Sequence, residues 1–424
     1  MRFIFTVYVE LMPHLYCSVL LILILLSSLY PLLLIKRKKP ISHNVDPETY
    51  RRIIEGKGLD QKMHNQLNAR QSRAIPNQRL HVVFGIENAL TTDNETQAKC
   101  FIRRAKSLIN LSPIAWESLS GFVHSAARRS IDDAIADSPD NARIMLTSLV
   151  QVLVLRVVLR VLFPMETEAL EIPDYHLLCL AEAINDTWVS SKSKTDHVCF
   201  QDNIPLQESL GIVFRNLNCL DPKENPLNLV IPGFETMWRI VLRFFIEVRY
   251  TSGLHHPEWR ETLATFAHTP TKDEFERPKG EQNLSAEMLV NEALRLYPPT
   301  KRVHRGFLPV GSDTVEVLNA DIEMVQSATH IWGSNAELFD PRRWRALTSQ
   351  QRLAFFPFGS RPFVCPAQAM FGPRAIAMIV GVLLIELGGE WSLFLDADCA
   401  EGLGLGVKLS NERTEYRNLC LARD

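Results

Sequence analysis

Residues 356–374 read FPFGSRPFVCPAQAMFGPR, and this stretch sets the main expectation for the chain. Cys365 stands alone between an aromatic, glycine-containing loop and Pro366. Proline is favoured in the first turn of a helix because its missing N–H would be unpaired there anyway. We therefore expect Cys365 to lie at a helix N-terminus, where the helix dipole and free N–H groups stabilise a thiolate.

The side chains around Cys365 leave two interpretations open. Phe358 and Phe363 can keep water away from the sulfur, and Gly359 permits a tight turn. A thiolate in a dry, hydrogen-bonded nest is a strong axial ligand for haem iron. A buried and unreactive cysteine fits the same loop equally well, so the loop alone does not decide.

The composition is that of a globular enzyme, with 46% hydrophobic and 22% charged residues in 424. A net charge of −2 argues against a nucleic-acid partner, and no basic run interleaved with aromatic residues occurs in the main body. The eight cysteines are scattered without the spacing of a zinc site, which predicts reduced thiols in a cytosol-facing domain.

The N-terminal region has a different character. Residues 15–35 carry no charge, and about 20 such residues are needed to cross a bilayer as a helix. The basic cluster 36–39 follows and predicts a cytoplasmic body. A cleaved signal peptide is the alternative, but its apolar core would be shorter. The predicted divisions are a lumenal N-terminus (1–12), a single transmembrane anchor (13–35), a basic linker with an abbreviated N-terminal region (36–80) and a catalytic domain (81–424).

The rest of the chain favours a mainly α fold with a small β portion. A second apolar run, 143–163, contains Arg156 and Arg160, whose charges are costly inside a bilayer. We predict a buried helix there. Short strands are expected at 314–318 and 407–410.

A helix ending before Pro298 should place Glu292 and Arg295 on its apolar face, with Ser285 as the N-cap. A buried carboxylate and guanidinium three residues apart can pair, but their other donors and acceptors also need partners. The segment FDPRRW, 339–344, could direct Arg343 toward Glu292. The alternative is an exposed surface pair.

The apolar stretch 229–248 predicts a long helix in which Gly233 leaves a gap where a ligand can approach the backbone. Thr236 lies on the same side, and Glu235 is on a neighbouring edge. Pro232 removes one helical N–H and disturbs the carbonyl near Asn228. In the alternative interpretation, Thr236 only bonds back to the carbonyl four residues earlier, that of Pro232.

Taken in this order, Glu292-x-x-Arg295, Phe339-x-Pro341-x-Arg343 and the loop ending in Cys365 resemble the cytochrome P450 family of haem-thiolate monooxygenases. The resemblance covers residues from about 80 to 424, together with the anchor of the membrane-bound members. It implies a cytochrome P450-like fold and a haem b cofactor. It further implies the following roles: Cys365 as the metal ligand; Phe358, Gly359 and Arg361 in the haem loop; Lys99, Arg103 and Arg305 as propionate partners; Glu292, Arg295 and Arg343 as a structural triad; and Gly233, Glu235 and Thr236 in an oxygen-binding groove.

The chain departs from the family pattern near the cysteine. Arg361 and Phe363 stand where the family usually has a glycine and an arginine or histidine, and Ala367 replaces a frequent glycine. These changes put the contact of Arg361 with a propionate in doubt. The pair 372–373, Gly-Pro, is expected to kink the helix after the cysteine.

The activity implied by the resemblance is insertion of one oxygen atom from O2 into an apolar small molecule. Electrons would come from NADPH through a separate cytochrome P450 reductase, with cytochrome b5 as a second donor, at the endoplasmic reticulum membrane. The departures are similar to those of divergent fungal members in secondary metabolism, which suggests a terpenoid-like substrate. Two alternatives stay open: a haem-dependent rearrangement or dehydration without oxygen activation, and a catalytically inactive membrane-anchored scaffold.

Overall fold

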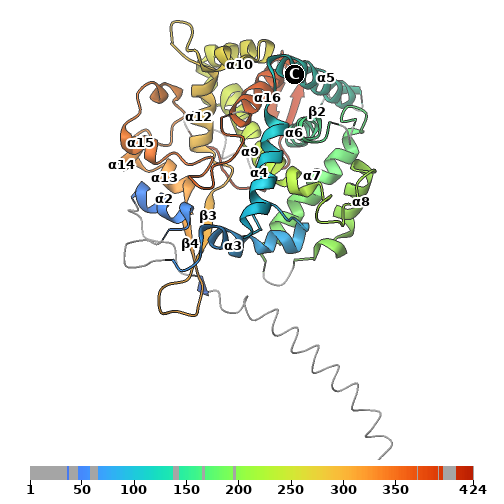
Figure 1. Ribbon diagram of the computed structural model, residues 1–424. Helices are drawn as coiled ribbons and strands as arrows, with labels where there is room; N and C mark the ends of the chain where they lie inside the picture. Colours follow the sequence, from blue (N-terminus) through green and yellow to red (C-terminus); the bar gives the residue numbers. More distant parts are fainter. Residues whose placement is uncertain are drawn as a thin grey trace, which may run out of the picture.

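The computed structural model describes residues 36–37, 46–57, 65–136, 143–164, 168–193, 197–369, 371–389, 391–394 and 407–423. The predicted lumenal segment 1–12 and anchor 13–35 lie outside these residues. Among the described helices, none is both long enough and apolar enough to cross a bilayer. The described chain is mainly helical with short strands, as predicted (Figure 1).

The α-helices have the following bounds: α2 Pro47–Glu55, α3 Ala69–Phe84, α4 Glu95–Ile109, α5 Pro113–Ala136, α6 Leu146–Leu162, α7 Asp174–Ser190, α8 Ile204–Val213, α9 Leu227–Tyr250, α10 Pro257–His268, α11 Lys272–Glu276, α12 Ala286–Leu296, α13 Ile322–Gln326, α14 Thr329–Trp332, α15 Ser349–Leu353 and α16 Gly372–Glu386. Short 3₁₀ turns cover Phe200–Asp202, Ser252–His255 and Pro341–Arg345.

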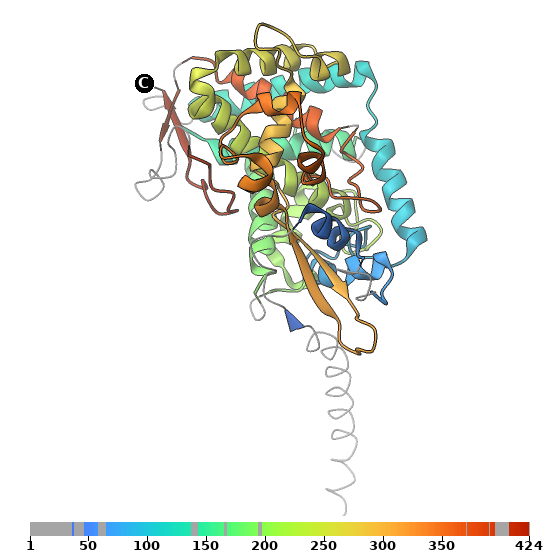
Figure 2. The same ribbon diagram turned by 90° about the vertical axis from the view of Figure 1, so that its left-hand side faces the viewer.

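Two small sheets lie at different ends of the helical body (Figure 2). In the first, β4 (Glu316–Asp321) pairs with β1 (Lys36–Arg37) in parallel and with β3 (Arg302–Phe307) antiparallel. In the second, β6 (Cys420–Arg423) lies between β2 (Arg143–Met145) and β5 (Trp391–Phe394), and both pairings are antiparallel. The strand predicted at 314–318 overlaps β4. The strand predicted at 407–410 is wrong, because that segment has no regular structure and the pairing occurs at β6 farther on.

The centre of the body is formed by α9 and α16, which pack against each other (Figure 1). Nearly all of α16 is apolar and buried, as expected for a helix surrounded by other helices. Most of the run 143–163 forms α6, which packs on α9 as a buried helix of the body, while its first three residues form β2. Arg156, only 1% exposed, pairs with Asp174 and donates to the carbonyls of Ala169 and Ile172. These partners explain how a charge is tolerated there.

Pro232 lies inside α9 without ending it. Because proline has no N–H, the carbonyl of Asn228 loses its helical donor. The side-chain amide of Asn88 donates to that carbonyl at 2.9 Å instead. The buried acceptor therefore stays satisfied, and the loop after α3 is tied to the start of α9.

The described part of the region 36–80, predicted as a basic linker with an abbreviated N-terminal region, includes regular helices. It contains α2 and most of α3, and both helices contact the first sheet. The helix α3 begins with a reciprocal cap between Asn68 and Gln71. The sequence did not predict α3, because the apolar residues that bury this helix are few and irregularly spaced.

The packing of α10 on α16 is very close at Gly381. A β-carbon at this position would lie 2.3 Å from the carbonyl oxygen of Leu263, which no side chain can tolerate without a backbone shift. We expect Gly381→Ala to lower the free energy of unfolding by about 1–3 kcal/mol, since overpacking forces the helices apart. Chemical denaturation measures this change.

The matched control is Gly121→Ala in α5, where a β-carbon would meet nothing within 4 Å. Alanine favours the helix over glycine by roughly 0.5–1 kcal/mol, so this variant should be slightly more stable. Equal effects of the two substitutions would contradict the close packing of α10 on α16.

Candidate functional site

The loop before Cys365 folds back on itself through backbone hydrogen bonds. The N–H of Cys365 donates to the carbonyl of Phe358 at 2.9 Å, and that of Phe363 donates to Ser360 at 2.7 Å. Gly359 has a φ of +76°, in the left-handed region that favours glycine. A β-carbon there would also lie 3.0 Å from the carbonyl oxygen of Phe363. The loop therefore depends on glycine at this position.

The prediction that Cys365 starts a helix is wrong. Residues 366–369 form turns, and α16 begins only at Gly372. The N–H groups of Phe371 and Gly372 both donate to the carbonyl of Ala367, at 3.2 and 2.7 Å. Pro373 then occupies the first turn of α16, where its missing N–H costs nothing. The predicted kink at 372–373 is therefore a helix start.

The sulfur of Cys365 is free and lies deep in the protein. Burial raises the pKa of this thiol above its ordinary value, and the N–H of Ala367 and the guanidinium of Arg73 offset part of the rise. The side chains of Cys365 and Arg73 nevertheless keep accessible surface. Because Cys365 keeps accessible surface, its thiol can meet a ligand.

Three guanidinium groups surround the ring of Phe363. Their central carbons lie 5.6, 4.9 and 4.9 Å from the ring centre, for Arg70, Arg73 and Arg305 respectively. These are cation–π distances. Arg70 pairs with Glu95 at 2.6 Å, but no described carboxylate pairs with Arg73 or Arg305. The three groups form the Phe363 arginine cluster.

The charges of this cluster oppose one another. Burial lowers the pKa of Arg73 to about 10, and the nearby Arg70 adds to the effect. Burial lowers the pKa of Arg305 to about 9, and Arg73 adds to it. Buried like charges without a counterion are unfavourable, so an anion at this position would stabilise the cluster.

Of the four residues predicted to meet an anionic cofactor edge, only Arg305 lies in this cluster. Lys99 is exposed on α4 and pairs with Glu95 at 3.3 Å. Arg103 is exposed on the same helix, which lies at the edge of the body (Figure 2). Arg361 is also exposed. None of these three side chains is among the cations that contact Phe363.

The sequence reasoning missed Arg70 and Arg73. They lie three residues apart, and therefore on one face of α3. A signal was present, because Asn68 and Gln71 have the spacing of a helix start in the stretch assigned to a linker. That these arginines meet Phe363 depends on contacts between distant segments.

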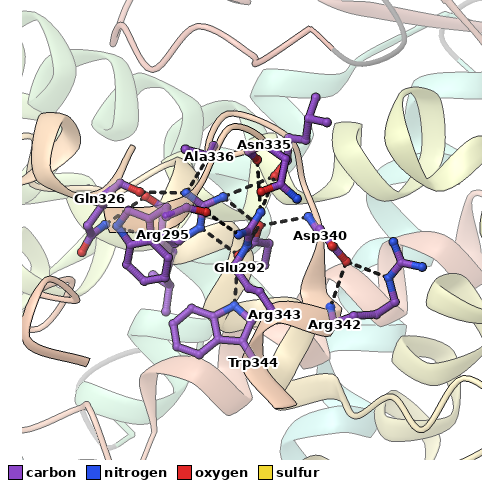
Figure 3. A network of polar contacts seen from close by, with 12 residues as sticks. Glu292, Arg295, Gln326, Asn335, Ala336, Asp340, Arg342, Arg343 and Trp344 are labelled. Carbon is purple, nitrogen blue, oxygen red and sulfur yellow. Dashed lines mark hydrogen bonds and ion pairs between the residues drawn. The ribbon is translucent and has the colours of Figure 1, made fainter. Parts of the chain in front are cut away.

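Below the loop, the carboxylate of Glu292 is fully buried and accepts hydrogen bonds from four residues (Figure 3). Arg295 donates twice, at 2.9 and 2.8 Å, and the predicted contact from Arg343 is present at 2.8 Å. The indole of Trp344 donates at 3.0 Å and the N–H of Asp340 at 2.9 Å. Both carboxylate oxygens are thus satisfied without water.

This network reaches the loop through Gln326. Arg295 donates to the carbonyls of Gln326 at 2.8 Å and Ala336 at 2.6 Å. The side chain of Gln326 accepts from the N–H of Phe356 at 2.8 Å, at the start of the loop that carries Cys365. The Glu292 network therefore fixes the base of the cysteine loop.

In α9, the side chains of Glu235 and Thr236 are bonded to other groups of the protein, and Gly233 contacts a neighbouring helix. The hydroxyl of Thr236 donates to the carbonyl of Pro232 at 3.0 Å, which is the alternative geometry considered from the sequence. Glu235 is buried and forms an ion pair with Arg413. A β-carbon on Gly233 would meet Val158 and Leu162, at 3.4–3.6 Å. Gly233 therefore lies where α9 crosses α6.

A separate pocket of about 470 Å³ lies between α3, the loop that follows it and α4. Its lining includes Gln71, Gln78, His81 and Thr91, and none of the predicted site residues. Neither Arg70 nor Arg73 lines this pocket, so it is distinct from the Phe363 arginine cluster.

The residues around Cys365 and Phe363 fit a haem group by their chemistry. Cys365 supplies one accessible thiol, and the Phe363 arginine cluster supplies cations without carboxylate partners, as two propionates would require. The buried Nη1 of Arg70 also lacks a hydrogen-bond partner among the described residues. We accordingly assign Cys365, Arg73 and Arg305 as the residues that would hold it.

Comparison with curated proteins identifies related sequences. Cytochrome P450 72A552 of Barbarea vulgaris is 29% identical over 116 residues, 24% of this chain and 23% of that protein. Cytochrome P450 716A67 of Medicago truncatula is 34% identical over 121 residues, 25% of this chain and 22% of that protein. The match spans about a quarter of each relative. No protein-family model matches the chain.

Solved structures share the fold over a greater length. A six-coordinated cytochrome P450 from Thermus thermophilus aligns with a TM-score of 0.51 and 17% identity, over 80% of this chain and 83% of that one. The heme domain of a cytochrome P450DA mutant aligns with a TM-score of 0.53 and 16% identity, over 89% and 86%. The chain has the cytochrome P450 fold and is similar in sequence to cytochromes P450 over about a quarter of its length, which supports the predicted family.

The Glu292 network gives a direct test of stability. We expect Glu292→Gln to lower the free energy of unfolding by about 3–5 kcal/mol, because it leaves buried Arg295 and Arg343 without a counterion. Glu287→Gln on the same helix is the control. That carboxyl is half-buried with no described ion pair, and burial raises its pKa, so its neutral form should cost less than about 0.5 kcal/mol. Similar losses in both variants would contradict the special role of Glu292.

Proposed function

We propose that this protein is a haem-thiolate monooxygenase that inserts one oxygen atom from O2 into a small organic molecule. The observation that carries the proposal is the accessible free thiol of Cys365 close to cations that have no described carboxylate partner. Without an anionic cofactor, the buried arginines Arg73 and Arg305 would have no counterion among the described residues. The family relationship supports the same conclusion.

Each residue has a proposed task. Haem b, when bound, supplies the redox chemistry of oxygen activation. Cys365 would be the thiolate ligand, and the N–H of Ala367 would stabilise its negative charge. Arg73 and Arg305 orient the cofactor through its propionates, and Phe363 excludes water. Glu235 and Thr236 hold the protons that oxygen reduction consumes.

The remaining elements of the proposal come from the family resemblance. NADPH supplies electrons through a cytochrome P450 reductase, with cytochrome b5 as a second donor. Residues 13–35 attach the chain to the endoplasmic reticulum membrane, with the catalytic domain in the cytoplasm. The substrate is largely apolar, and a terpenoid of secondary metabolism is the class we propose.

The carbon-monoxide difference spectrum of the reduced full-length protein tests the proposal. We expect a band at the thiolate-ligated position, and its loss in Cys365→Ser without loss of helical circular dichroism. Cys199→Ser is the control, since Cys199 is an exposed free thiol, and its spectrum should be unchanged. An unchanged band in Cys365→Ser would refute the assignment of this ligand.

The role of Arg73 in holding haem can be tested by a binding measurement, without measuring enzyme activity. We expect Arg73→Gln to weaken haemin binding to the haem-depleted protein by about tenfold, the size of one charge-assisted hydrogen bond. Arg103→Gln, on the exposed face of α4, should change binding less than about twofold. Tryptophan fluorescence quenching measures both affinities. The opposite order would mean that α4, and not α3, holds the cofactor.

One observation favours a second candidate, a rearrangement or dehydration that does not activate oxygen. The hydroxyl of Thr236 donates a hydrogen bond to the carbonyl of Pro232, and Glu235 forms an ion pair with Arg413. Neither group is therefore free to deliver a proton in this arrangement. Thr236→Ala distinguishes the two activities. For a monooxygenase we expect more reducing equivalents to be lost per product formed, whereas unchanged coupled turnover would favour the second candidate.

A further inference from the structure

The pocket between α3 and α4 takes no part in the proposed function. Its volume of about 470 Å³ lies in the range of roughly 300–1,000 Å³ that is typical of sites for small molecules. Leu67, Ala74 and Ile75 give it an apolar part, and its other lining residues are polar. A ligand held in this pocket would therefore combine a short alkyl part with several polar contacts.

The charge of the lining is negative. Glu87 and Asp93 contribute two exposed carboxylates from the loop after α3. Neither carboxylate forms an ion pair with a described residue. Among the described residues that line the pocket, none is a lysine or an arginine. A cation placed in the pocket would therefore meet attraction from both carboxylates.

The cations on the neighbouring turns have other contacts. Arg70 and Lys99 pair with Glu95, at 2.6 and 3.3 Å. Arg73 and Arg79 contact aromatic rings outside the pocket, at 4.9 and 5.3 Å from the ring centres. None of these four cations therefore forms an ion pair with the two carboxylates of the pocket.

Several hydrogen-bond donors of the lining are already bonded to the protein. The side-chain nitrogen of Gln78 donates to the carbonyl of Thr91 at 2.9 Å. The hydroxyl of Thr91 donates to the carbonyl of Ile86 at 2.9 Å. The hydroxyl of Thr92 donates to the side-chain oxygen of Gln97 at 2.6 Å. The donors that remain are N–H groups of glutamine amides, which carry no charge.

Acceptors are in excess by comparison. The Nδ1 of His81 lies 3.3 Å from the carbonyl oxygen of Ile86, and because a carbonyl only accepts, this nitrogen carries the hydrogen. The Nε2 of the neutral ring is then an acceptor. The oxygens of Glu87 and Asp93 accept as well. The lining thus favours a ligand that donates hydrogen bonds and carries positive charge.

We propose that this pocket binds a small alkylguanidinium, with its N–H groups on Glu87 and Asp93 and its alkyl part against the apolar residues. A guanidinium group has five N–H donors and no acceptor, which complements the lining. Its planar donor pairs match carboxylate oxygens. The pocket contains none of the residues assigned to haem, so this inference does not depend on the proposed function.

Binding of butylguanidinium and of butylurea to the full-length protein, measured by calorimetry, tests this inference. The two ligands share their shape and alkyl chain, but butylurea is neutral and has a carbonyl acceptor. We expect butylguanidinium to bind at least about fivefold more tightly, since it faces two carboxylates. A guanidinium group stays protonated, so it offers no lone pair to haem iron.

Two single variants of the pocket give the second part of the test. Glu87→Gln should weaken butylguanidinium binding by roughly threefold, the size of one exposed ion pair, and change butylurea binding less than about twofold. Asp93→Asn should act in the same way. Glu117→Gln on α5 removes an exposed carboxylate outside the pocket and should have no effect.

Equal binding of the two ligands overturns the inference, and so does a preference that neither pocket variant reduces. If Glu117→Gln weakens binding as much as the pocket variants, the preference reflects net charge alone and the inference also fails. A preference reduced by Glu87→Gln or Asp93→Asn, but kept in Glu117→Gln, supports it, whether or not the carbon-monoxide band is present. If the pocket variants do not fold, the comparison of the two ligands on the unaltered chain decides.

Discussion

The buried carboxylate of Glu292 is the interaction on which the candidate site depends. It holds Arg295 on the same helix and draws in Arg343, Trp344 and Asp340 from a distant segment of the chain. A buried ion pair stabilises a fold only when its remaining donors and acceptors are bonded, and here they are. Through Gln326 the same network fixes the backbone at Phe356, so the position of the cysteine loop follows from a charge placed far from the sulfur.

The protein treats its buried cations in two ways. Arg295 and Arg343 face a carboxylate and are bonded to it, which makes them part of the framework. Arg73 and Arg305 face an aromatic ring and each other, and Arg239 and Arg243 face carbonyl oxygens. No described carboxylate forms an ion pair with these four arginines. Burial of uncompensated charge is costly, so the Phe363 arginine cluster is a place where an anionic ligand would be stabilising.

Patterns that act within one helix were read correctly from the sequence. The hydroxyl of Ser285 caps α12, the spacing of Glu292 and Arg295 places both on its buried face, and most of the run 143–163 forms the buried helix α6. The interpretation of Cys365 as a helix start was wrong. Proline favours a first turn wherever it occurs, and Pro373 rather than Pro366 occupies that position in α16. Local preference allows a helix to start at either Pro366 or Pro373, and the packing of α16 favours the start at Pro373.

The sequence by itself indicated the cytochrome P450 fold, the helical character and the contact of Glu292 with Arg295 and Arg343, because these depend on residue type and short-range spacing. Only the tertiary structure decided which cations gather around Phe363 and along α9. Arg73 and Arg305 are far apart in the sequence, and so are Arg239 and Arg413. No periodicity encodes such meetings, since they arise when several helices and a sheet bury their apolar faces together. The positions of the buried arginines are therefore set by this packing.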